Sequence, residues 1–181
     1  MKIKELYPDV ITEDLDYEYK AVLNPENPVK WAKTIVGYAN GKGGILFVGV
    51  SNDGDAFGLD LNEIDKTKNL IARINDRHIY PHARIQYMMR SVDANADRFV
   101  LALNVSPADS VVRYREGDFN ETVYIKGDGY STPATPEEII SLSKGNEEST
   151  MKQAKFNIWK ENGANIIACV WNTEMILPSL H

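Results

Sequence analysis

Glu18 and Lys20 are two charged side chains that a single strand would place side by side. They alternate with Tyr17 and Tyr19, and residues two apart in a strand point to the same face. An acid beside a base on one face of a sheet could form a polar binding site. The alternative is an ordinary ion pair, which stabilises a domain little when it is exposed. The sequence leaves both interpretations open.

A glycine-rich segment, Gly-Lys-Gly-Gly at 41–44, could bind an anion. It lacks the Gly-x4-Gly-Lys-Ser/Thr pattern of a nucleotide phosphate loop, and it precedes a predicted strand rather than a helix. Asn40 and the amides that follow it could still hold an anion, with Lys42 beside them. The alternative, which the pattern favours, is a close turn from a helix to a strand.

Basic residues are concentrated in one part of the chain. Between Lys66 and Arg90 the only acid is Asp76. Arg73 and Arg77 are four residues apart, so they share a face of a helix, and a phosphate backbone could run along them. A solvated helix face is the alternative interpretation. The full basic set is Lys66, Lys68, Arg73, Arg77, Arg84 and Arg90.

The histidines and the cysteine do not suggest a metal site. His78 and His82 flank Pro81, so they do not share a regular helix, and they lack the spacing of zinc ligands. Cys169 is the single cysteine and lies among apolar residues, as a buried thiol would. It cannot close an intrachain disulfide, which favours a reducing cytoplasm.

The composition is that of a soluble domain. The chain has 181 residues, of which 43% are hydrophobic and 25% charged, enough for one domain with a core and a short appendage. It has no apolar run of membrane-spanning length and no apolar signal-peptide segment at its start, so we expect a cytoplasmic protein without membrane contact. The net charge of −6 weighs against a protein that coats nucleic acid non-specifically.

The residue pattern predicts the elements that must position these side chains. We expect a strand near 16–22, a helix from Pro28 to about Asn40 with Asn27 as its N-cap, and a strand at 45–50. That strand has almost no alternation, which indicates burial on both faces. The further predicted elements are an Asp53-Gly54 turn, a helix at 62–78, strands at 85–90, 99–105 and 122–126, and a helix from a capping box at 135–138 through Leu142.

These elements predict a two-layer α/β (α+β) domain, a mixed β-sheet with two to four packed helices. We expect this domain to span residues 1–143. A polar linker would follow at 144–150. Residues 151–181 would add a helix and a final strand, too short to form a second domain.

The chain resembles the Schlafen AlbA-type domain over roughly residues 13–142. That family is described as DNA-binding and is common in bacterial RecG-like transcriptional regulators. The family more often has Phe in place of Tyr19, Thr or Ser in place of Gly41, and Arg in place of Lys126. The matching features are Glu18-Tyr19-Lys20, Ala39-Asn40, Gly43-Gly44, residues 45–50, Asp53-Gly54, Gly58, Val105-Ser106-Pro107, Tyr124-Ile125-Lys126, Gly127 and Ala134.

The resemblance also implies a set of acids. In nuclease members of the Schlafen group, residues placed like Glu13, Glu18 and Asp53 bind a divalent cation for RNA cleavage. Carboxylate oxygens suit Mg²⁺ or Mn²⁺. Glu13 and Glu18 are five residues apart and would face opposite sides of a strand, so Glu13 would have to lie in a bend. The alternative is that Glu13 is a surface acid and Asp53 a turn former.

Three functions remain as hypotheses. The leading one is a non-catalytic domain that binds DNA or RNA, in a cytoplasmic bacterial regulator that the resemblance suggests is a homodimer. The second is a metal-dependent ribonuclease using the three acids. The third is a protein-interaction module, suggested by the net acidity and the apolar tail. The residues expected to contact nucleic acid are Lys20, Lys42, Arg73, Arg77, Arg84 and Lys126.

Overall fold

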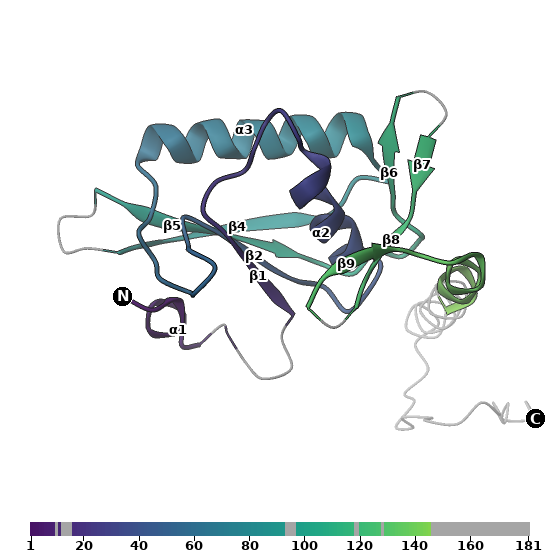
Figure 1. Cartoon of the computed structure of the whole chain (residues 1–181), viewed down its shortest axis with the longest axis horizontal. Helices are drawn as coiled ribbons and strands as arrows, with labels where there is room; N and C mark the ends of the chain where they lie inside the picture. Colours follow the sequence, from purple (N-terminus) through teal and green to yellow (C-terminus); the bar gives the residue numbers. More distant parts are fainter. Residues whose placement is uncertain (10, 12–15, 93–96, 118–119, 128, 146–181) are drawn as a thin grey trace, which may run out of the picture.

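A mixed four-stranded sheet forms the centre of the protein. The computed structural model describes residues 1–145 except 10, 12–15, 93–96, 118–119 and 128 (Figure 1). The strand order is β1-β2-β5-β4, with β1 parallel to β2 and the other neighbours antiparallel. This confirms the predicted mixed sheet. Its strands are β1 (Tyr17–Lys20), β2 (Gly44–Val48), β4 (Ile85–Ser91) and β5 (Phe99–Val105).

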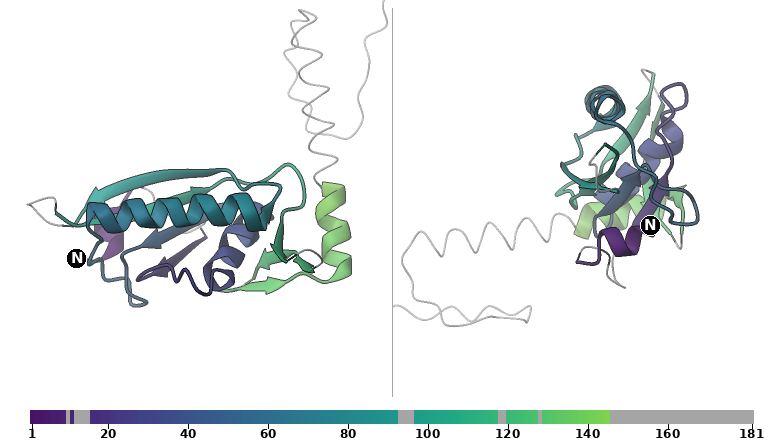
Figure 2. Two further views of the ribbon diagram at one scale, coloured as in Figure 1. Left: turned by 90° about the horizontal axis from the view of Figure 1, so that it is seen from above. Right: turned by 90° about the vertical axis from the view of Figure 1, so that its left-hand side faces the viewer.

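Both faces of this sheet are covered. Helices α2 (Val29–Ala39) and α3 (Leu61–His78) pack on one face, and α1 (Ile3–Leu6) packs on the other (Figure 2). Every residue of β2 is buried. Leu46 belongs to the core cluster beneath α2 and α3, whereas Phe47 belongs to the cluster beneath α1. The absence of alternation in this strand was therefore a correct sign of burial on two sides.

Two smaller sheets complete the described fold. The first has the antiparallel order β3-β6-β7, and the second is the hairpin of β8 and β9. A helix at 136–145 follows β9. The strands are β3 (Ile79–Tyr80), β6 (Arg113–Glu116), β7 (Asn120–Thr122), β8 (Tyr124–Lys126) and β9 (Ser131–Pro133).

The single strand predicted at 122–126 is wrong in one respect. The predicted strand is interrupted at Val123, which is buried. β7 ends before it and β8 begins after it, and the two pair in different sheets. Strand propensity does not reveal such a break, because the two halves find partners that lie elsewhere in the sequence. The short elements α1, β3, β6 and β9 were not predicted, since they are too short to carry a hydrophobic period.

The helix starts agree with the predictions except at α2. Pro28 is the N-cap of α2 and makes no side-chain cap, so Asn27 does not have the capping role predicted for it. The capping box at 135–138 is confirmed: Glu138 Oε2 accepts from Thr135 N at 2.8 Å, and Glu138 N donates to Thr135 Oγ1 at 3.3 Å.

The turn from α2 to β2 needs glycine at 43 and 44. Gly43 has φ of +87°, and a Cβ there would lie 2.8 Å from the Val105 carbonyl oxygen. A Cβ on Gly44 would lie 2.5 Å from the ring of Tyr38. The glycine-rich segment is therefore a close turn between packed elements, the interpretation that the pattern favoured.

Two predictions concern segments at the margin of the described residues. The helix at 136–145 continues two residues into the predicted linker, and the rest of that linker and residues 151–181 lie outside the described part.

Among the described helices, none combines the length and the apolar character that crossing a bilayer requires.

Candidate nucleic-acid interface

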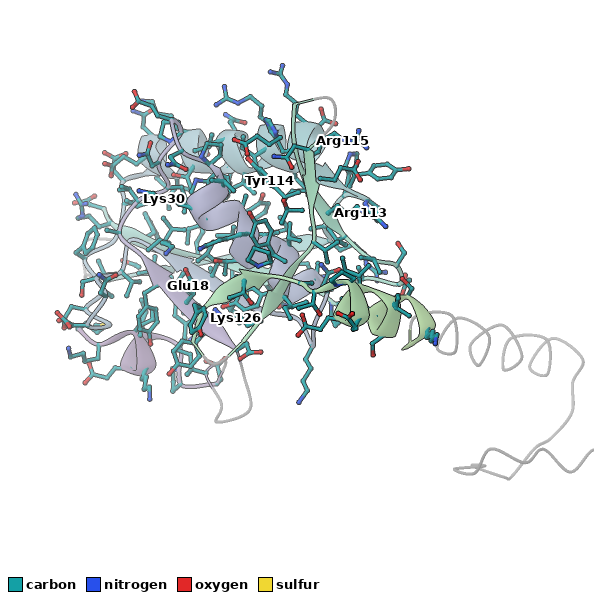
Figure 3. All side chains as sticks on the ribbon, turned by 45° about the vertical axis from the view of Figure 1, so that its right-hand side comes forward. Glu18, Lys30, Arg113, Tyr114, Arg115 and Lys126 are labelled. Atoms are coloured by element: carbon teal, nitrogen blue, oxygen red, sulfur yellow. The ribbon has the colours of Figure 1, made fainter. Side chains whose placement is uncertain are left out.

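Glu18 lies at the centre of a charge cluster that joins three elements (Figure 3). Lys20 Nζ, on the same strand, is 2.7 Å from Glu18 Oε1. Lys126 Nζ of β8 is 3.1 Å from Glu18 Oε2. The Thr34 hydroxyl of α2 donates to the same Oε2 at 3.0 Å. The cluster therefore ties β1 to α2 and β8.

This cluster is mostly shielded from solvent. The side chain of Lys126 is 7% exposed and that of Glu18 is 20% exposed. Burial by itself would raise the pKa of Glu18, but the hydrogen bonds and charges of Lys20 and Lys126 outweigh it and lower the pKa below 4.5. The ammonium of Lys126 also lies 5.2 Å from the ring centre of Tyr38, whose pKa is raised by burial. Lys20 and Lys126, predicted to contact nucleic acid, are thus engaged by Glu18.

The structure does not bring Glu18 and Asp53 together. Glu18 bonds to α2 on one face of the sheet. The turn that contains Asp53 lies on the other face. Lys2 Nζ, next to α1, donates to the Asp53 carbonyl at 3.2 Å. A Cβ on Gly54 would lie 3.3 Å from Tyr19, which packs against the core residues beneath α1. Two ammonium groups beside Glu18 would also repel a cation.

The described residues by themselves therefore do not form a Mg²⁺ or Mn²⁺ site at this place. Within the described part of the chain, no three His, Cys, Asp or Glu side chains lie close enough together to hold a metal ion. Glu13 lies outside the described residues, so the three-acid site of Glu13, Glu18 and Asp53 stays a prediction.

Asn40 has a structural role. Its Nδ2 donates to the carbonyls of Val112 at 2.8 Å and Tyr124 at 2.9 Å, and its Oδ1 accepts from Val112 N at 2.7 Å. The amides of Gly41 and Gly43 donate to the Tyr38 carbonyl. These groups are not free to bind the anion considered for this segment. Lys42 is exposed in the turn.

Two members of the basic set are paired with acids in different places. Arg90 Nη2 is 2.8 Å from Asp9 Oδ2, and its guanidinium lies 4.6 Å from the ring centre of Tyr7, on the α1 side of the sheet. Arg84 Nη2 is 3.1 Å from Asp109 Oδ2. Neither arginine extends the surface of α3.

Lys68 also lies apart from the rest of the set. Its ammonium is 3.8 Å from the sulfur of Met89 and 5.8 Å from the ring centre of Tyr87, both on β4. The six predicted basic residues therefore do not form one surface. Lys68, Arg84 and Arg90 contact separate parts of the molecule.

The remaining three, Lys66, Arg73 and Arg77, form a stripe on α3. At 3.6 residues per turn they fall within an arc of roughly 40° around the helix axis. All three are exposed, and none forms an ion pair with a residue that the structure describes. We call them the α3 stripe.

A groove runs beside the α3 stripe. It has a volume of about 460 Å³ and lies between α3 and the connection from β1 to α2. Its walls combine apolar and basic side chains, so a phosphate could contact the stripe while an apolar group lies in the groove. The lining residues are Leu23, Pro25, Lys66, Thr67, Asn69, Leu70 and Arg73.

The structure adds three residues that the sequence interpretation missed. Arg113 and Arg115 of β6 lie on the outer face of the β3-β6-β7 sheet, beyond the C-terminal end of α3 (Figure 3). Tyr80 of β3 is the cross-strand partner of Arg113 and lies on the same face. The alternation Arg113-Tyr114-Arg115 was the signal available in the sequence, because Tyr114 is buried and its neighbours are half-exposed.

The family model "Schlafen, AlbA_2" matches residues 13–135, more than half of the chain. The chain belongs to the Schlafen AlbA_2 family. The residues that carried the resemblance, notably Glu18, Lys20, Asn40 and Lys126, bond to other parts of the same domain. In this AlbA_2 domain these four residues therefore help to maintain the fold.

The AlbA_2 domain is also similar to the solved structure of the DIP2311 protein from Corynebacterium diphtheriae. The sequences are 19% identical and the TM-score is 0.49, with 73% of this chain covered. This chain spans 29% of that chain's length. No curated protein matches the chain.

Proposed function

We propose that this AlbA_2 domain binds nucleic acid, DNA or RNA, through phosphate contacts made by the α3 stripe. Membership of the family suggests nucleic-acid binding. The observation that carries the proposal is that Lys66, Arg73 and Arg77 are exposed, share one helix face and lie beside a groove. Unpaired basic residues in a row fix a phosphate backbone in position without reading its sequence.

The size of the stripe limits the strength of this binding. Lys66 and Arg77 are separated by roughly 16 Å along the helix axis, so three phosphates at most would be neutralised by the stripe itself. The net charge of −6 opposes a general attraction to polyanions. We therefore expect binding that is local, moderate in affinity and sensitive to salt.

The proposal extends to the biological setting that the family resemblance suggests. We propose a cytoplasmic protein of bacterial transcriptional regulation that acts as a homodimer. Two copies would place two α3 stripes on one nucleic acid, and the second contact would then be intramolecular, which raises the overall affinity.

We expect the double variant Arg73→Ala/Arg77→Ala to bind labelled duplex DNA, single-stranded DNA and tRNA about tenfold more weakly at low salt. In a plot of log K against log salt, the slope should become shallower by about 1.4 to 1.8, because two phosphate contacts are lost. Fluorescence anisotropy across a salt series measures both quantities.

The matched control is Lys4→Ala/Lys144→Ala, which removes the same charge from exposed positions outside α3. It should bind like the wild type. If both double variants weaken binding equally, the attraction is one of net charge and the α3 stripe is not the site. If the wild type binds none of the three ligands even at low salt, a protein partner becomes the better assignment.

Asp53 provides the test of the ribonuclease hypothesis. We expect Asp53→Asn to leave stability and nucleic-acid affinity unchanged, because Asp53 is exposed in a turn. Incubating the wild type and the variant with tRNA and Mg²⁺ or Mn²⁺, followed by gel analysis, measures cleavage. If the wild type cleaves tRNA and the variant does not, the domain is a metal-dependent nuclease rather than a binding domain.

A further inference from the structure

The outer face of the β3-β6-β7 sheet displays an aromatic ring among arginines. Tyr80 is 58% exposed. The Cα atoms of Tyr80 and Arg113 are partners across the two strands, and the Arg115 guanidinium lies 5.4 Å from the centre of the Tyr80 ring. Residues that alternate with these on the same strands, Ile79 and Tyr114, are buried. The sheet therefore has a core face and an outer face of different chemistry.

A single carboxylate holds the two arginines. Glu121 Oε1 is 2.6 Å from Arg115 Nη2 and 2.9 Å from Arg115 Nε, and Glu121 Oε2 is 3.7 Å from Arg113 Nε. The two hydrogen bonds restrict the Arg115 guanidinium, so that less side-chain entropy is lost when a ligand stacks on it, whereas Arg113 makes only a longer ion pair. Both arginines remain about 40% exposed, at 38% and 43%, so they can still meet a ligand.

This face begins close to the end of the α3 stripe in the sequence. Arg77 lies in the last turn of α3, which ends at His78, and β3 begins at the next residue. The His78 ring stacks on Tyr114 at 5.6 Å, and its Nδ1 is 2.8 Å from the Arg115 carbonyl oxygen. These contacts fix the end of α3 against β6. Arg77 is three positions before Tyr80 in the chain, so a single nucleic-acid strand with its phosphates along α3 could reach Tyr80 with its next nucleotides.

We propose that the outer face of the β3-β6-β7 sheet is a stacking platform for unpaired bases, so that the preferred ligand is single-stranded nucleic acid. This inference rests on the proposed function. Tyr80 offers a flat ring to one base, and Arg113 and Arg115, which Glu121 pairs, offer guanidinium planes to the adjoining nucleotide. A duplex keeps its bases stacked on one another and cannot use the ring. Stacking on such a platform tolerates any base, because every base has a π-face.

The decisive variant is Tyr80→Ala. We expect it to weaken the binding of a labelled single-stranded oligonucleotide roughly 5- to 150-fold, the range for loss of one base–aromatic stack. Binding of duplex DNA and the salt slope should stay unchanged, because no phosphate contact is removed. Tyr80→Phe keeps the ring and should bind single strands like the wild type.

Tyr130→Ala is the matched control, since Tyr130 is 63% exposed but lies at the β8–β9 turn. It should have no effect on either ligand. If Tyr80→Ala matches Tyr130→Ala while the wild type binds single strands, the platform is refuted and the α3 stripe proposal stands. If the wild type prefers duplex DNA, the platform is refuted as well. If the wild type binds no nucleic acid, both proposals fall together.

Discussion

Replacing Asn40 by aspartate is expected to lower the free energy of unfolding by about 3 kcal/mol. The amide nitrogen of Asn40 donates to two carbonyl oxygens, those of Val112 and Tyr124. A carboxylate has no proton to donate, so both carbonyls would lose a partner and face a negative charge. The end of α2 would keep the hydrogen bond from Val112 N but lose the two that join it to the Val112 and Tyr124 carbonyls.

Urea denaturation at neutral pH measures this effect. Asn52→Asp is the matched control, because it makes the same chemical change at an exposed turn position and should alter stability by less than about 0.5 kcal/mol. Equal midpoints for the two variants would show that the Asn40 bonds contribute no net stability.

Replacing Glu18 by alanine is expected to cost about 3–5 kcal/mol, the usual result of leaving a buried charge without its partner. Lys126 is 7% exposed on its side chain and has Glu18 as its ion-pair partner. Without that carboxylate, the ammonium must either stay unpaired beside Tyr38 or leave its site and pull β8 away from α2. Lys20 is 31% exposed and can turn towards solvent.

A double variant separates charge from packing at this cluster. Glu18→Leu/Lys126→Met replaces the two groups by apolar side chains of similar size, which is often neutral for a buried pair. We expect it to regain most of the stability lost in Glu18→Ala. A double variant that is less stable than Glu18→Ala would show that the ion pair itself, rather than the unpaired lysine, determines the effect.

The same cluster predicts a pH dependence. The folded pKa of Glu18 is lowered below 4.5 by Lys20 and Lys126 against the opposing effect of burial. A carboxyl with a lowered folded pKa stabilises the protein fully above its unfolded pKa, and this stabilisation is lost as the pH falls through the folded pKa. The stability difference between wild type and Glu18→Gln should therefore be largest at neutral pH and shrink below pH 4.5.

The expected instability of Glu18 variants affects how the ribonuclease hypothesis is tested. A Glu18 variant that loses activity would be expected to lose its fold as well, so the loss would not identify a catalytic group. Asp53 is exposed and bonds through its backbone carbonyl to Lys2. Its substitution changes the carboxylate alone and gives the clearer result.

The sequence by itself determined the longer elements of this protein. The helix predicted at 62–78 is α3, and the apolar residues that recur in it at helical spacing, Ile64, Leu70, Ile71 and Ile74, are buried. The unbroken apolar run at 45–50 predicted a central strand covered on both faces. These signals are local, since each depends on residues within a few positions of one another. The family resemblance came from the order of such local features along the chain.

The tertiary structure alone decided what the polar residues do. Glu18 and Lys126 are separated by 108 positions, and Asn40 and Tyr124 by 84, so no periodicity relates them. The same holds for Tyr80 and Arg115, which meet because β3 pairs with β6. For the same reason, three members of the basic set form the exposed α3 stripe, while Lys68, Arg84 and Arg90 contact other parts of the molecule. A polar side chain takes its role from partners that the fold brings to it, and those partners are distant in the sequence.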